Sequence, residues 1–172
     1  MPGVYGASGG ARNGHTTLPE VALIEVRRTI PAGPDRVFAV LADGWMYAAW
    51  VVGAAHVRDV DPQWPAVGAR IHHSLGPWPL MMHDVTKVLN VEPDRMLELD
   101  ARMWPAGAAR VKLTLTPDGQ GHTDVRMEEE VVSGPLSLVP SQAQALVLRP
   151  RNNESLHRLA DMAVNRKTGA QS

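Results

Sequence analysis

The sequence contains no cysteine, which excludes a disulfide framework, a thiolate nucleophile and any metal site built on thiolates. No stretch approaches the ~18 consecutive apolar residues that a membrane-spanning helix needs, and the N-terminus lacks a charged region followed by an apolar one. We therefore expect no membrane span, and a cytoplasmic location by default.

Lysine is scarce, since only three of the 17 basic residues are lysine. The 17 basic residues nearly balance the 18 acidic ones, and no block of like charge occurs along the chain. Such a charge distribution does not attract a polyanion, so we expect no nucleic-acid partner. The bias toward arginine, with many Ala, Gly and Pro, is typical of a bacterial protein from a GC-rich genome.

Motifs for nucleotide binding and hydrolysis are also missing. The glycines near the N-terminus follow no strand pattern and precede no Gly-Lys-Ser/Thr, and the chain has neither a Rossmann fingerprint nor a Gly-x-Ser-x-Gly elbow. We therefore expect no cofactor, and neither hydride transfer nor serine hydrolysis is supported.

The composition that remains is that of a globular domain. The 172 residues are 44% hydrophobic and 20% charged, which fits one domain with a substantial core. Residues 1–18 show no periodic apolar pattern and are expected to form a disordered tail. We expect the folded domain over residues 19–166 and a second disordered tail over residues 167–172.

The pattern of apolar residues predicts an α+β fold. Residues 21–30 predict a first strand, and residues 34–44 and 45–51 predict two short helices after it. Over residues 54–132, Gly, Pro and Asp turn signals at roughly ten-residue spacing delimit six further strands. Adjacent strands joined by short turns predict an antiparallel meander with one buried face and one solvent-exposed face.

An apolar stripe predicts a long C-terminal helix over residues 141–164. Pro150 lies inside this helix, where proline removes one backbone hydrogen bond. We therefore expect a bend near residues 147–150.

Residues 29–43, which read TIPAGPDRVFAVLAD, run from the end of the first predicted strand through most of the first short helix. Together with Trp50 and the stretch VEPDRML at residues 91–97, they resemble the polyketide cyclase/dehydrase and lipid-transport group of the START/Bet v 1-like (SRPBCC) superfamily. The resemblance covers about residues 20–165. It implies a helix-grip fold, in which a seven-stranded curved antiparallel sheet wraps around the C-terminal helix over a hydrophobic cavity. The superfamily has no shared catalytic signature, so the resemblance transfers no catalytic residue.

Two histidines are candidate functional residues. Period-two alternation places His73 on the apolar face of one predicted strand and His83 on that of the next. A hairpin centred near Pro77 would pair His73 with His83, and His72 with Asp84. Two neutral imidazoles could bond a ligand hydroxyl or act as acid and base; alternatively, they bond backbone or water at the sheet rim. A third metal ligand is not visible, so we expect no metal site.

Glu129 and Asn152 are the other candidate polar groups of the interior. Alternation in the last strand points Glu129 inward, where a carboxylate needs a partner or a raised pKa. Glu129 is thus a candidate acid/base or ligand anchor, or else it forms a structural ion pair with an arginine such as Arg28 or Arg149. Asn152, on the helix stripe, could orient a ligand or cap carbonyls freed by Pro150.

Eight methionines and five tryptophans stand beside one phenylalanine and two tyrosines. Flexible thioethers suit the lining of a pocket, although they are also ordinary core residues. Trp50, at the end of a short helix, could close a cavity mouth or cover the edge of the core. The predicted ligand-binding residues are Trp50, Met81, His83, Met103, Met127, Glu129 and Asn152.

The leading hypothesis is binding or transport of a hydrophobic small molecule, such as a lipid, polyketide or aromatic metabolite, by a monomer or homodimer. The alternative is a polyketide cyclase/dehydratase-like enzyme, in which His73, His83 and Glu129 are the candidate acids and bases. A protein-interaction module would instead require an exposed apolar patch.

Overall fold

The computed structural model describes residues 23–75, 82–103, 105 and 107–166, so the expected tails 1–18 and 167–172 lie outside the described residues. Its elements are β1 (Leu23–Ile30), α1 (Pro34–Leu41), the 3-10 helix η1 (Gly44–Met46), α2 (Tyr47–Trp50), β2 (Ala54–Val60), β3 (Arg70–Leu75), β4 (Met82–Glu92), β5 (Met96–Met103), β6 (Gly107–Pro117), β7 (Thr123–Ser133), the 3-10 helix η2 (Pro135–Leu138) and α3 (Ser141–Asn165).

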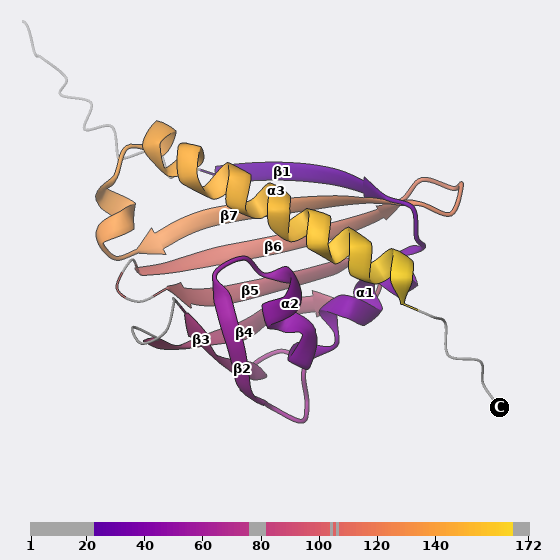
Figure 1. Cartoon of the computed structure of the whole chain (residues 1–172), viewed down its shortest axis with the longest axis horizontal. Helices are drawn as coiled ribbons and strands as arrows, with labels where there is room; N and C mark the ends of the chain where they lie inside the picture. Colours follow the sequence, from indigo (N-terminus) through magenta and orange to yellow (C-terminus); the bar gives the residue numbers. More distant parts are fainter. Residues whose placement is uncertain (1–22, 76–81, 104, 106, 167–172) are drawn as a thin grey trace, which may run out of the picture.

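The seven strands form one antiparallel sheet in the order β1-β7-β6-β5-β4-β3-β2. Strands β2 to β7 follow one another as a meander, and β1 joins the sheet beside β7. β1 and β2 are consecutive in sequence but occupy opposite edges, so α1 and α2 carry the chain from one edge to the other. Figure 1 shows α3 lying across the sheet, with α1 and α2 beside its C-terminal part. This is the helix-grip fold that the sequence predicts.

The two short helices form because their apolar side chains share one face. Pro34 occupies the first turn of α1, where its missing N–H has no intrahelical acceptor to lose. The buried residues of α1 are Val37, Phe38, Val40 and Leu41. These residues pack into the same core as Leu156 and Leu159 of α3, which closes one end of the interior.

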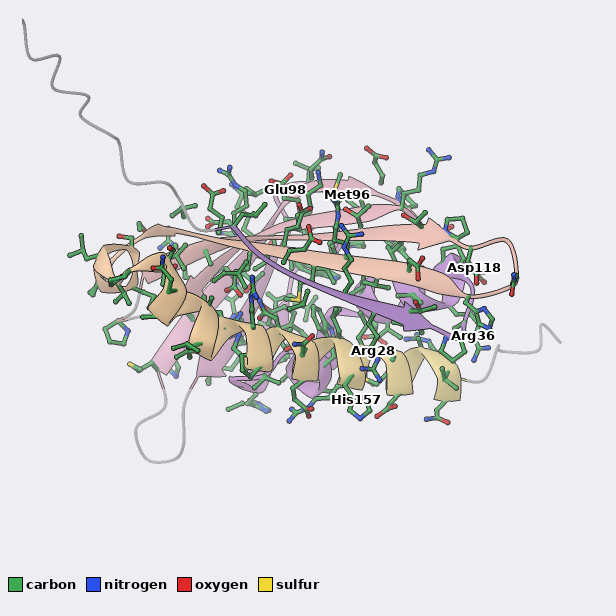
Figure 2. All side chains as sticks on the ribbon, turned by 90° about the horizontal axis from the view of Figure 1, so that it is seen from above. Arg28, Arg36, Met96, Glu98, Asp118 and His157 are labelled. Carbon is green, nitrogen blue, oxygen red and sulfur yellow. The ribbon has the colours of Figure 1, made fainter. Side chains whose placement is uncertain are left out.

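Helix α3 forms the second layer of the molecule, on one side of the sheet, as Figure 2 shows. It runs through Pro150 as one continuous element from Ser141 to Asn165. Pro150 has no N–H, so the carbonyl of Leu146 loses its intrahelical hydrogen-bond donor. Pro150 and Leu146 are both exposed, which places this carbonyl on the solvent-exposed side of the helix. The proline does not split the helix, and the bend expected near residues 147–150 stays a prediction.

Strand β4 alternates in the opposite phase to the predicted one. His73 is opposite Asp84, and Ser74 is opposite His83, so the register differs by one residue from the expected pairing of His73 with His83. Because side chains alternate with a period of two, this single step sends His83 to the exposed face and brings Asp84 and Thr86 inside. The prediction that His83 points inward is wrong.

Candidate functional site

A chain of three buried polar side chains lies where α2 packs near β3 and β4. The Thr86 hydroxyl of β4 lies 3.0 Å from the Tyr47 hydroxyl of α2 and 3.0 Å from Nε2 of His73 in β3. All three residues are buried. Thr86 therefore bridges a phenol and an imidazole inside the fold.

Aromatic contacts hold this hydrogen-bonded chain in place. The ring centroids of Tyr47 and His73 are 5.2 Å apart. The Trp50 ring packs edge-on against Tyr47, with 5.6 Å between the ring centroids. Nδ1 of His73 is buried and forms no hydrogen bond with the described residues. The imidazole is thus held by ring packing and by one hydrogen bond at Nε2, while Nδ1 has no hydrogen-bond partner among the described residues.

Burial keeps the chain neutral near pH 7. It lowers the pKa of His73, an effect that the nearby Asp84 carboxylate partly opposes. Burial also raises the pKa of the Tyr47 hydroxyl, although the hydrogen bond to Thr86 acts in the other direction. The phenol, hydroxyl and imidazole are therefore all uncharged hydrogen-bonding groups at neutral pH.

A second polar group joins β7 to α3. Glu129 has no exposed surface, and Nη2 of Arg151 lies 2.8 Å from each of its carboxylate oxygens. Nδ2 of Asn152 donates to Oε2 of Glu129 at 2.6 Å, and Nε of Arg151 donates to Oδ1 of Asn152 at 3.1 Å. The structure thus supports the ion-pair interpretation of Glu129.

The arginine in this pair is not one that the sequence indicated. Arg149 is exposed, and Arg28 reaches from β1 to His157 of α3 with a nitrogen-to-nitrogen distance of 2.9 Å. Figure 2 shows Arg28 and His157 close together at α3. Asn152 likewise bonds Glu129 and Arg151, so its amide is used inside the ion-pair cluster. Capping of carbonyls near Pro150 is not among its bonds to described residues.

The two groups act on the same interior. Arg151 and Glu129 both contribute to the electrostatic environment of the Tyr47 hydroxyl, as does Asp84. The main apolar core includes Tyr47 of the first group and Met127, which lies in β7 two residues before Glu129. The interior therefore combines a neutral hydrogen-bonded chain and a compensated ion pair within apolar surroundings.

The remaining predicted residues have different positions. Trp50 and Met127 are buried in the main core, at 2% and 3% exposure. Met81 lies outside the described residues, and Met103 ends β5 with a side chain that also lies outside the described part. His83 is on the far side of the sheet from His73. His73, Glu129 and Asn152 are thus the polar candidates that face the interior.

Sequence reasoning missed Tyr47, Thr86 and Arg151. Tyr47 precedes Trp50 by three residues on the same predicted helical stretch, so helical spacing was the signal for a shared face. The inward position of Thr86 could be predicted only from the correct phase of β4. Arg151 had no signal of its own, because a side chain beside the inward Asn152 on a helix can turn either way.

In the part of the chain that the structure describes, clefts with volumes of about 480, 670 and 360 Å³ lie on the outer face of the sheet. Their linings consist mainly of charged and threonine side chains that alternate outward, such as Arg27, Thr114, Arg126 and Lys87. Figure 2 shows this outer side through Met96 and Glu98, which lie away from α3. These clefts are not the expected apolar cavity, which stays a prediction.

Among the described residues, no cluster of three or more His, Asp or Glu side chains gathers where a metal ion could bind. No helix in the described part of the chain is long and apolar enough to span a membrane.

Comparisons with known proteins agree with this architecture. In solved structures, the chain is similar to the Zhui aromatase/cyclase from Streptomyces sp. R1128, with 17% identity and a TM-score of 0.66, covering 87% of this chain and 99% of that one. A Rhodobacter sphaeroides protein is similar at 21% identity and a TM-score of 0.67, with 87% and 97% covered. Ara h 8.0201 is similar at 10% identity and a TM-score of 0.67, with 86% and 100% covered. At these identities the likeness shows the fold alone.

A comparison with curated proteins gave no match. A family model, however, matches residues 22–163, which include every strand and nearly all of α3. Its description is "Polyketide cyclase / dehydrase and lipid transport". The chain therefore belongs to this family.

Proposed function

We propose that this protein binds a hydrophobic small molecule, of the lipid, polyketide or aromatic class, between the sheet and α3. The observation that carries the proposal is the buried Tyr47–Thr86–His73 chain, with an unsatisfied imidazole nitrogen inside an apolar core. Ligand sites of this kind are mostly apolar and use a few polar groups to fix orientation. Membership of a family that includes lipid transport supports the proposal.

A second candidate function is a cyclase/dehydratase-like reaction on the bound molecule. His73 supports it, because a neutral imidazole bonded through a hydroxyl to a phenol can accept and return protons near neutral pH. The other two predicted acid/base residues do not support it equally. His83 lies on the opposite face, and both Glu129 oxygens already accept hydrogen bonds from Arg151.

Native mass spectrometry of the protein purified from its own or a related host tests binding. We expect one apolar molecule per chain, released unchanged on denaturation. Met127→Trp, which fills the interior, should abolish this mass shift, whereas Val132→Trp on an exposed position of the same strand should retain it. Circular dichroism of both variants checks that they are folded.

Two results together would overturn the proposal. One is the absence of any co-purified apolar molecule. The other is failure of the apolar dye 1-anilinonaphthalene-8-sulfonate to bind the folded protein. A bound molecule that is released chemically changed would instead favour the cyclase/dehydratase-like reaction.

A further inference from the structure

Nδ1 of His73 is a buried nitrogen that has no hydrogen-bond partner among the described residues. More than about nine in ten buried polar groups in proteins have a hydrogen-bond partner, so an exception calls for an explanation. His73 is 2% exposed, and its Nδ1 lacks a partner among the described residues even though Nε2 is bonded to Thr86. Asp84, which is opposite His73 in the strand register, accepts the Val85 backbone N–H.

The direction of the hydrogen-bonded chain decides what Nδ1 can do. Of the three groups, the Tyr47 phenol is the strongest donor and the imidazole nitrogen is the strongest acceptor, while the Thr86 hydroxyl can do both. These strengths favour a chain that runs from Tyr47 O–H to Thr86 Oγ1, and from Thr86 O–H to Nε2 of His73. Each bond polarises the next in this order. A neutral imidazole that accepts at Nε2 carries its proton on Nδ1.

We propose that Nδ1–H of His73 donates a hydrogen bond to a neutral carbonyl oxygen of the bound molecule. The inference rests on the proposed function and narrows its ligand class to carbonyl-bearing aromatic or polyketide-like molecules, as opposed to plain hydrocarbon chains. A carbonyl oxygen accepts the hydrogen bond without adding a charge. A carboxylate would bring a further negative charge, without a counter-ion of its own, into an interior that already contains Asp84 and Glu129.

The selectivity follows from the unsatisfied donor. A hydrocarbon in the site leaves Nδ1–H buried and unpaired, whereas a ketone of the same shape satisfies it. One such hydrogen bond corresponds to about tenfold tighter binding. The preference should depend on His73 and on Thr86, because Thr86 sets the tautomer.

Isothermal titration calorimetry with two planar isosteres tests the inference. The probes are 2-acetylnaphthalene and 2-isopropenylnaphthalene, which differ by an oxygen in place of a methylene group. We expect the wild type to bind the ketone about tenfold more tightly. His73→Phe should abolish the preference, and Thr86→Val should reduce it. Ser74→Ala is the matched control, because Ser74 is buried beside His73 but alternates to the other face, and it should leave the preference unchanged.

The outcomes separate the two proposals. Equal binding of both probes by the wild type overturns the carbonyl inference and leaves hydrophobic binding standing. Failure of the wild type to bind either probe also overturns the carbonyl inference, and the co-purification and dye-binding results then decide the proposed hydrophobic binding. The ¹⁵N chemical shifts of His73 provide a readout without ligand: protonation at Nδ1 supports the inference, and protonation at Nε2 overturns it.

Discussion

Nη2 of Arg151 lies 2.8 Å from both carboxylate oxygens of Glu129, a residue with no exposed surface. The ion pair ties α3 to β7 through the interior, and Asn152 adds a third hydrogen bond at 2.6 Å. A buried carboxylate of this kind depends on its partner, because an unpaired charge in a protein interior is strongly unfavourable. Loss of Arg151 should therefore lower the stability of the whole domain.

Arg151→Met should lower the free energy of unfolding by about 3–5 kcal/mol, since it leaves Glu129 buried without its counter-ion. Urea denaturation followed by circular dichroism measures the effect. Arg149→Met, two residues away on an exposed position of the same helix, should change stability by less than about 0.5 kcal/mol. Similar losses in the two variants would show that the Glu129 pair is not important for stability.

His73 should make stability depend on pH. Its pKa is lowered by burial in the folded protein, so the unfolded chain binds the proton first as the pH falls. The stabilising contribution is therefore complete well above about pH 6.5 and is lost below it, with a slope of at most about 1.4 kcal/mol per pH unit.

His73→Gln keeps a hydrogen-bonding group near the Nε2 position but cannot titrate in this range. Unfolding free energies of both proteins, measured from pH 7.5 to pH 5.5, should therefore converge as the pH falls. Parallel curves would mean that His73 does not titrate differently in the folded and unfolded states.

The corrected phase of β4 can be tested with two variants. Thr86→Val should lower the free energy of unfolding by about 1–3 kcal/mol, because it leaves the buried hydroxyl of Tyr47 and Nε2 of His73 unpaired. His83→Ala, on the exposed face, should change it by less than about 0.5 kcal/mol. Thermal and urea denaturation measure both. The reverse order of effects would restore the originally predicted phase.

Pro150→Ala should stabilise the protein. Alanine restores the N–H that can donate to the Leu146 carbonyl, in a helix that already continues through this position. The gain should be on the order of 1–2 kcal/mol, because the freer unfolded chain offsets part of a proline cost of about 3 kcal/mol. Urea denaturation checks the sign, and an unchanged midpoint would show that the exposed helix face accommodates the proline without cost.

The fold was predictable because its signals are local. Turn residues at regular spacing delimited the strands, and the apolar stripe of α3 marked the helix that covers them. Glu129 was found to be inward by alternation alone, since its neighbours Met127 and Val131 are both apolar and both buried. In such a strand, only one phase fits a half-buried sheet.

Strand β4 was not predictable in the same way, because its sequence favours the wrong phase. The phase that carries His83 also contains Val85, whereas the phase that is buried contains Asp84 and Thr86. A register shift between Val88 and Asn90 further breaks the alternation within the strand. Because the buried phase of β4 contains polar residues, the sequence pattern assigned that phase to the exposed face.

The sequence by itself determined the order of the elements, the seven-stranded sheet with its long helix, and the inward positions of His73 and Glu129, because alternation and turn chemistry act between near neighbours. Tertiary structure alone decided the partners. Thr86 meets His73 from 13 positions away and Tyr47 from 39, and Arg151 meets Glu129 from 22. Such contacts depend on strand register and on how the helices pack against the sheet, and these arise from the summed interactions of the whole chain.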